Sequence, residues 1–315
     1  MPEWLIERGI GETRAVRVER GEIVEARIFL DGIVRAGTVI EARLAKTDMP
    51  ALAVGDGQEY LLPNGAPGAS EGATIAIEIT REPIPGTEPW KRPLARLATP
   101  DAAVSADHPD GEILPIPSPA DRLAELGWCD LLEEARAAAV PFSGGELRVS
   151  PTPAMTLIDV DGQLSPFELA LAGAAAAART ILRHGIGGSI GIDLPTVAGR
   201  TERQAIAAAI DAILPRPFER TAVNGFGFLQ IVRPRRHASL FELAADRAAF
   251  EARALLRRAS FERTGATRLV GHPAVIAVLE QRRDWLDALA RQVGGAVTLR
   301  GDPSLPIHGA YAEAG

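Results

Sequence analysis

The sequence predicts a mixed α/β (α+β) protein. Strand and helix patterns alternate between residues 120 and 260, which is typical of strand–helix–strand units. Residues 34–98 instead hold short strand patterns separated by Gly, Pro and Asn, which indicate a small β-barrel. Alternating apolar and polar residues over 3–30, with a turn at Gly21, predict a β-meander. We therefore expect an α/β core combined with a separate all-β unit.

The same patterns divide the chain into five parts. We expect an N-terminal β segment at 1–33 that packs with the core, a barrel at 34–98 and an extended Pro-rich linker at 99–119. The α/β core follows at 120–260 and a small C-terminal α/β domain at 261–315. Single helices are predicted over residues 119–139, 166–183, 240–259 and 273–293. By periodicity alone, an SH3-like barrel fits 34–98 nearly as well as an OB-type barrel.

Composition indicates a soluble globular protein. The chain has 315 residues, 46 % hydrophobic and 24 % charged, and no apolar run approaches the ~20 residues that span a bilayer. The N-terminus lacks the layout of a signal peptide, so we expect no membrane partner and a cytoplasmic location. Cys129 is the only cysteine, which excludes an internal disulfide and a cysteine zinc cluster within one chain.

The charge distribution is uneven. The net charge is −7, yet residues 200–300 hold 17 Lys+Arg against 10 Asp+Glu, a net +7, whereas residues 1–199 hold 17 against 29. A local basic region attracts a polyanion more than the global sum repels it, because salt screens charges beyond about 10 Å. Arginine suits phosphate contacts, although a GC-rich genome would produce the same excess of arginine over lysine.

Two apolar strand patterns each end in an acid. Asp159 follows one, Asp193 follows the other, and a predicted helix connects them, so the strands are expected to be parallel neighbours. Asp161, two residues after Asp159, would share its face. Carboxylates that converge at the ends of parallel strands favour a Mg²⁺ site. The alternative is that each Asp only caps a helix or makes a turn.

Three segments carry a resemblance to a known family. Residues 154–161 (AMTLIDVD), 186–194 (IGGSIGIDL) and 225–235 (GFGFLQIVRPR) are similar, in order and near spacing, to the catalytic core of the ribonuclease E/G family. The resemblance covers about two thirds of the chain and is specific between 145 and 240. It implies an RNase H-like/DNase I-like α/β core, an inserted S1-type OB barrel and a small C-terminal domain.

The resemblance also implies a function, Mg²⁺-dependent endonucleolytic hydrolysis of single-stranded RNA to 5′-phosphate and 3′-hydroxyl ends. It makes Asp159 and Asp193 the metal ligands and Asp161 a residue that positions the attacking water. The implied RNA contacts are Tyr60, Trp90, Lys91, Arg233, Arg235 and Arg236. Ordinary barrel packing would explain Tyr60 and Trp90 equally well, and a solvated strand edge would explain the arginines.

Departures from the family pattern keep other interpretations open. The segment that senses the RNA 5′ end is largely missing, and with Cys129 alone a homodimer would not be linked by zinc. Residues 170–173 (ALAG) replace polar residues, and Gln230 replaces a Glu. The first alternative is a catalytically weak or inactive RNA-binding protein of the same fold. The second is a metal phosphoesterase acting on a small nucleotide.

Overall fold

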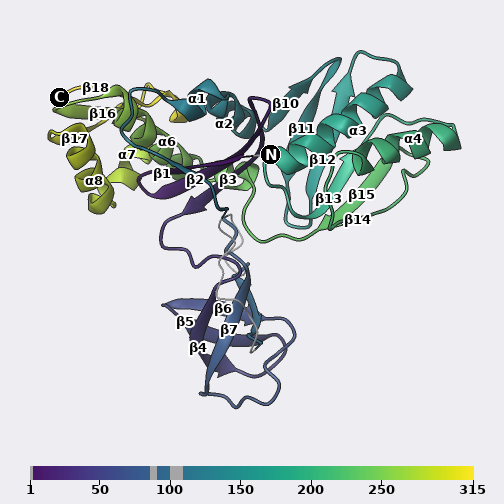
Figure 1. The fold of residues 1–315 in the computed structure, drawn as a ribbon, viewed down its shortest axis with the longest axis horizontal. Coiled ribbons are helices and arrows are strands. Elements are labelled where there is room, and N and C mark those ends of the chain that lie inside the picture. Colours follow the sequence, from purple (N-terminus) through teal and green to yellow (C-terminus); the bar gives the residue numbers. More distant parts are fainter. Residues whose placement is uncertain (1–2, 86–90, 100–108) are drawn as a thin grey trace.

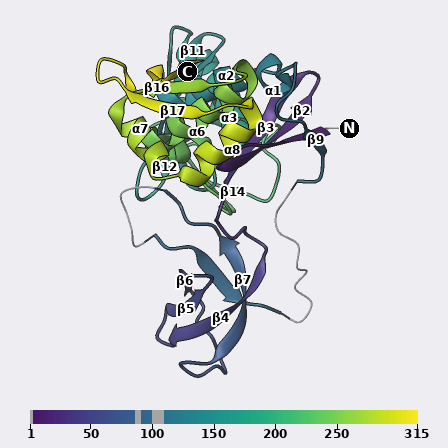
Figure 2. The same cartoon turned by 90° about the vertical axis from the view of Figure 1, so that its left-hand side faces the viewer.

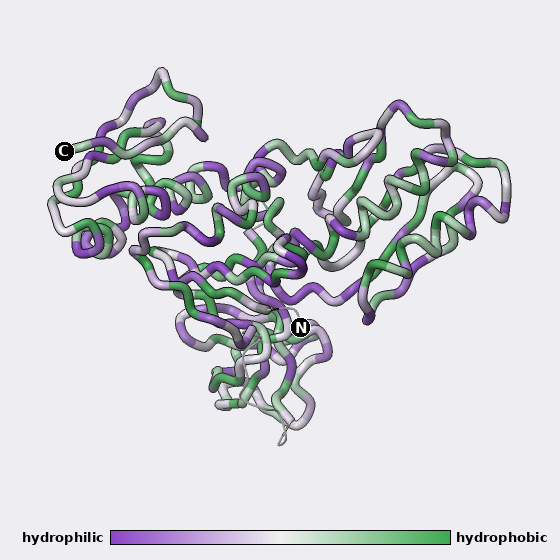
Figure 3. Tube along the Cα trace, turned by 45° about the horizontal axis from the view of Figure 1, so that its top comes forward, coloured by the Kyte–Doolittle hydropathy of each residue, from purple (hydrophilic) through white to green (hydrophobic). Residues whose placement is uncertain are grey.

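The computed structural model describes residues 3–85, 91–99 and 109–315. Within these residues, the fold is mixed α+β, with three open sheets and a closed barrel. Figures 1 and 2 show the barrel projecting from a larger body. In Figure 1 the C-terminus lies at one end of that body and α4 at the other. Hydrophobic stretches follow the strands and helices that meet inside the body (Figure 3).

The predicted N-terminal meander is present and extends by one strand. It consists of β1 (Glu3–Arg8), β2 (Glu12–Glu19) and β3 (Glu22–Leu30). The expected linker also contributes, because β9 (Glu112–Leu114) pairs parallel with β1 and gives the order β3-β2-β1-β9. Buried Leu5 and Val16 join the main hydrophobic core, so this sheet packs on the α/β region as expected.

The barrel is OB-like. Its strands are β4 (Val39–Lys46), β5 (Ala51–Gly55), β6 (Gln58–Leu62), β7 (Thr74–Arg81) and β8 (Leu94–Leu97). They close in the order β4-β5-β6-β8-β7, with β6 and β8 parallel and β7 paired back onto β4. Buried Leu44, Tyr60, Leu62 and Ile77 lie in the core cluster of the barrel.

The largest sheet forms the α/β region. Its order is β10 (Ala139–Phe142), β11 (Gly145–Pro151), β12 (Thr156–Gly162), β13 (Gly188–Asp193), β15 (Phe228–Arg233) and β14 (Glu219–Arg220). β12 and β13 are parallel, as the strand–helix–strand pattern predicted, whereas the other pairs are antiparallel. The short strand β10 was not predicted.

Two helices cover one face of this sheet. α3 (Pro166–Arg183) has the predicted bounds, and α4 (Arg200–Asp211) packs beside it. Gly173 allows α3 to lie close to β12, because a Cβ at this position would lie only 2.3 Å from Val160 Cγ1. The other face carries exposed side chains from β11, β12, β13 and β15, and we call it the open face.

Three helices predicted as single segments are each divided. Gly127, with φ +93°, separates α1 (Arg122–Glu125) from α2 (Trp128–Ala137). Asp246 ends α5 (Leu240–Ala245) and caps α6 (Arg247–Glu262) by accepting the Ala249 N–H. The helix predicted over 273–293 is divided into α7 (Pro273–Glu280) and α8 (Arg283–Val293).

The C-terminal domain combines these two helices with a small sheet. Its other elements are β16 (Thr267–Gly271), β17 (Val297–Gly301), η1 (Ile307–Gly309) and β18 (Tyr311–Ala314). Its sheet has the order β17-β16-β18.

Part of the basic excess in residues 200–300 lies inside the protein. Arg253 and Arg257 on α6 are both 6 % exposed. Arg253 Nε donates to Glu12 at 2.8 Å, and Arg257 donates to Glu7 at 2.8 and 2.9 Å and to Asp121 at 2.6 and 2.8 Å. The buried ion-pair network is Glu7, Glu12, Arg14, Asp121, Arg253 and Arg257. These cations neutralise the protein's own acids, so they do not contribute to a surface for RNA.

None of the helices in the described ranges is long and apolar enough to cross a bilayer.

Candidate functional site

Asp159 and Asp193 lie side by side on the open face. They are register partners on the parallel strands β12 and β13, whose backbones run about 4.8 Å apart. Both side chains are exposed, because alternation along each strand turns Ile158 and Ile192 into the core. The prediction that a strand–helix–strand unit brings these two acids together is therefore confirmed.

The carboxylate pair, Asp159 with Asp193, is held by no partner among the residues that the structure describes. Within those residues, neither side chain makes a hydrogen bond or an ion pair. Like charges directly opposite each other on neighbouring strands destabilise a sheet. A bound cation would remove that repulsion. If each Asp only capped a helix or made a turn, the two acids would have no reason to lie opposite each other.

The donor set fits Mg²⁺, which takes one or two protein carboxylates and keeps several waters. Among the described residues, no group of three or more His, Cys, Asp or Glu side chains could hold a metal. Asp161 lies two residues beyond Asp159 on the same exposed face, and its Oδ1 accepts the Gly162 N–H at 2.8 Å. Any metal here would therefore be coordinated by Asp159 and Asp193, and Asp161 would lie beside these two ligands.

The neighbouring strands surround the pair with polar groups. Arg148 on β11 is the register partner of Asp159, although its guanidinium pairs with Glu146 at 2.7 Å. On the other side, Gln230 Nε2 donates to Ser189 Oγ at 3.0 Å. The positively charged side chain of Arg148 therefore belongs to the strand next to the one that carries Asp159.

Arg233 does not lie beside the carboxylates. It pairs with Gly188 at the start of β13, whereas Asp193 at the end of β13 pairs with Phe228. Five residues of strand separate the two positions, roughly 17 Å. Arg233 also shares the covered face with Leu229 and Ile231, and burial lowers the pKa of its guanidinium. Arg233 is therefore not in position to contact a phosphate that is bound beside the carboxylate pair.

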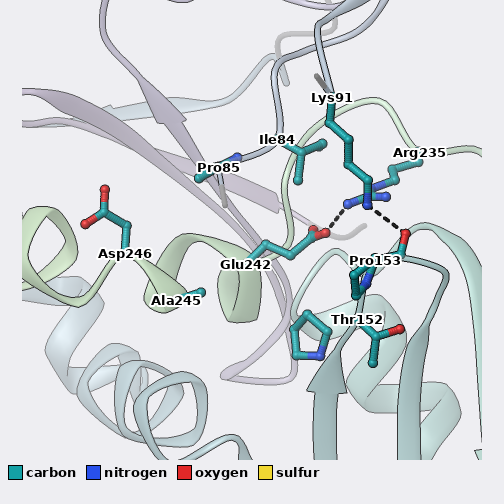
Figure 4. Close-up of a pocket in the computed structure, with 10 residues that line it drawn as sticks. Ile84, Pro85, Lys91, Thr152, Pro153, Arg235, Glu242, Ala245 and Asp246 are labelled. Carbon is teal, nitrogen blue, oxygen red and sulfur yellow. Dashed lines mark hydrogen bonds and ion pairs between the residues drawn. The ribbon is translucent and has the colours of Figure 1, made fainter. Parts of the chain in front are cut away.

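Arg235 and Lys91 meet in a cavity where the barrel joins the body (Figure 4). Lys91 Nζ donates to the Pro153 carbonyl at 2.7 Å, and Arg235 pairs with Glu242. Pro153 belongs to the turn that leads into β12. The structure therefore brings together two of the predicted RNA contacts, at the end of the sheet remote from the carboxylate pair.

This junction holds acids as well as cations, because Glu242 and Asp246 line the cavity together with Lys91 and Arg235. Burial lowers the pKa of Arg81, and the nearby Arg235 guanidinium lowers that pKa further. The Nε atoms of Arg81 and Arg235 are buried without a hydrogen-bond partner. Arg236 follows with an exposed side chain, and its carbonyl accepts the Glu82 N–H at 2.8 Å. An anion at this junction would meet these cations together with the carboxylates of Glu242 and Asp246.

Tyr60 cannot serve as a stacking surface in this structure. Its ring is 1 % exposed in the barrel core, because residues 60 and 62 of β6 point inward. Burial also raises the pKa of its hydroxyl. Packing, the alternative left open by the sequence, accounts for this residue. Trp90 lies outside the described residues.

Two surface features near the carboxylate pair were not predicted. Phe226 is 83 % exposed in the loop that links β14 to β15, just beyond Asp193. Arg200, Arg203 and Arg220 line a hollow beside the same loop. The exposure of Phe226 could have been predicted from the sequence. Glycines flank this residue on both sides and indicate a tight turn at the surface.

The chain matches none of the models of known protein families, and a search of curated proteins returns no match.

Proposed function

We propose that the chain is a Mg²⁺-dependent endoribonuclease that hydrolyses single-stranded RNA. The observation that carries the proposal is the carboxylate pair, two exposed acids in register where the parallel pairing of β12 with β13 ends, neither of them in an ion pair within the described residues. We also propose that the large sheet is the RNase H-like/DNase I-like core implied by the resemblance, and that the barrel is the S1-type domain. The hairpin β11–β12 followed by parallel β13 supports the first assignment, and the OB-like strand order supports the second.

The chemistry is hydrolysis of a phosphodiester. Water adds to phosphorus, the bond from phosphorus to the 3′ oxygen breaks, and that oxygen takes up a proton, which leaves a 5′ phosphate and a 3′ hydroxyl. Asp159 and Asp193 would hold the Mg²⁺, which neutralises charge on a phosphoryl oxygen and makes water a better nucleophile. Asp161, which lies on the same exposed face, would orient that water.

A labelled single-stranded RNA incubated with Mg²⁺ or with EDTA tests the proposal. We expect internal cleavage with Mg²⁺, none with EDTA, and downstream products whose 5′ phosphate allows ligation. A duplex of the same sequence serves as the control and should stay intact. Cleavage that persists in EDTA, or products that carry a 5′ hydroxyl, would contradict the mechanism.

The second candidate is an RNA-binding protein of the same fold without efficient catalysis. The observation that favours it is Arg148, the register partner of Asp159, which can neutralise that carboxylate in place of a metal. Buried Ala170 and Gly173 also replace polar residues expected near the site, and outer partners tune metal sites strongly. In the same assay, this candidate predicts RNA binding with no Mg²⁺-dependent products.

The junction cavity gives a separate prediction about RNA binding. Replacing Lys91 and Arg235 together with Gln should reduce the dependence of affinity on salt, because fewer counterions are released. For single strands the slope of log K against log salt should flatten by about 0.7 for each phosphate that the protein no longer neutralises. The measurement is a salt titration of RNA affinity in EDTA.

Lys46→Gln is the matched control for that titration, since Lys46 is the other lysine and is exposed at the end of β4. Its slope should equal that of the wild type. An equal flattening in both proteins would assign the effect to net charge and remove the junction from the RNA path.

A further inference from the structure

The loop from 221 to 227 holds an exposed aromatic ring in a fixed position. Asn224 Oδ1 accepts the N–H groups of Phe226 at 2.9 Å and Phe228 at 3.0 Å. Thr196 Oγ1 donates to the Phe226 carbonyl at 3.2 Å, and the Gly227 carbonyl accepts the Leu194 N–H at 3.2 Å. The backbone is thus held from both sides, whereas the Phe226 ring is left in water.

The loop that carries Phe226 ends beside the carboxylate pair. Phe228 is the register partner of Asp193, and Phe226 comes two residues before it in a turn, so the Cα atoms of the two phenylalanines are at most about 7 Å apart. The ring of Phe228 lies over Gly191 in the sheet, since a Cβ at Gly191 would be only 2.5 Å from the Phe228 Cζ. Phe226 is therefore the aromatic side chain that extends outward from this end of the sheet.

Positive charge lies beside the same loop. The hollow lined by Arg200, Arg203 and Arg220 also includes Ala222 and Val223 of the loop. Arg203 donates to the carbonyls of residues 197 and 198, and Arg220 pairs with Asp211. Arg200 is exposed and has no hydrogen bond or ion pair within the described ranges. Its guanidinium is available to an anion.

We propose that Phe226 stacks on a base of single-stranded RNA while Arg200 contacts the adjacent phosphate. The inference rests on the proposed function and adds a subsite that positions the strand over the carboxylate pair. Stacking on an aromatic face accepts any base, and arginine grips the backbone, which together suit a single strand. The small or polar neighbours Ala222, Asn224 and Gly225 provide too little apolar area for a stable protein interface.

The test measures RNA affinity in EDTA, where binding is separated from cleavage. Phe226→Ala should weaken binding about tenfold, or about 1.4 kcal/mol, whereas Phe226→Trp should retain wild-type affinity. Arg200→Gln should flatten the salt slope by about 0.7. Ile113→Ala, an exposed hydrophobic residue on β9, is the matched control and should change nothing.

An abasic scan then identifies stacking itself. Removing single bases along the RNA should reveal one position whose loss weakens wild-type binding, and Phe226→Ala should bind that abasic RNA as tightly as the intact strand. If the wild type cleaves RNA but Phe226→Ala binds it equally well, the subsite is wrong and the proposed function stands. If the wild type binds no RNA, both fail. Self-association that disappears in Phe226→Ala without a change in RNA affinity would assign the ring to a second copy and overturn the subsite.

Discussion

Asp193→Asn and Asp159→Asn are each expected to reduce Mg²⁺-dependent RNA cleavage by more than about a hundredfold. Each change removes one charged ligand from a site that offers two. Loss of an outer partner of a metal ligand already costs about ten- to a hundredfold, so loss of the ligand itself should cost more. The measurement is the single-turnover cleavage rate at saturating protein.

The same variants have a second readout that does not depend on activity. Because Asp159 and Asp193 repel each other without a counter-ion, replacing one with Asn should leave the melting temperature unchanged or raise it. Mg²⁺ should stabilise the wild type, since a ligand that binds the folded state shifts unfolding by mass action. That stabilisation should disappear in both Asn variants, as differential scanning calorimetry with and without Mg²⁺ would show.

Glu219→Gln is the matched control, because Glu219 is an exposed acid on β14 of the same sheet, and it lies two strands away from the carboxylate pair. It should retain the wild-type cleavage rate and the stabilisation by Mg²⁺. Wild-type rates in both Asn variants would show that the carboxylate pair is not the site. Loss of rate together with a lower melting temperature would indicate a structural role instead.

Local patterns predicted the large sheet well because they reflect burial. The alternation around Ile158 and Ile192 fixes which side chains enter the core, and the helix between the two strands makes them parallel. Together these rules place Asp159 opposite Asp193 on the exposed face. Helix ends were predicted less well, since a single residue such as Gly127 or Asp246 divides a pattern that periodicity alone continues.

The same alternation bears on two of the residues that the resemblance assigned to RNA. Tyr60 shares its face with Leu62 and is buried in the barrel, and Arg233 shares its face with Ile231 and is half-buried. Assigning them to RNA gave more weight to the motif than to the period of two along a strand. Phe226, in contrast, follows Gly225 in a loop, where no such period applies.

The buried ion-pair network could not be predicted from the sequence. Glu12 and Arg253 are 241 residues apart, and Glu7 and Arg257 are 250 apart. A count of charges by segment treats such residues as independent, so the basic excess of residues 200–300 looked like a surface. Only the fold, which packs α6 against β1 and β2, shows that these arginines neutralise acids from the N-terminal sheet.

Arg257→Met is therefore expected to lower the free energy of unfolding by about 3–5 kcal/mol. Burial opposes the charge on Arg257, but hydrogen bonds to Asp121 and Glu7 outweigh burial and raise its pKa above the ordinary value. Methionine fills a similar volume without the charge, so Glu7 would keep Arg14 alone, at 2.8 Å. Leaving a carboxylate that is 1 % exposed short of a partner is what costs stability.

Arg122→Met is the matched control for urea unfolding followed by circular dichroism. Arg122 also pairs with an acid, Glu112 at 2.6 Å, but both side chains are more than two-fifths exposed, so its loss should cost under about 1 kcal/mol. Glu7→Gln should destabilise less in the Arg257→Met background than in the wild type, because the two residues share one interaction. Equal losses in Arg257→Met and Arg122→Met would mean that burial does not strengthen these pairs. If the losses of unfolding free energy add up in the double variant, Glu7 and Arg257 act separately. The ion-pair network would then not be what joins α6 to the N-terminal sheet.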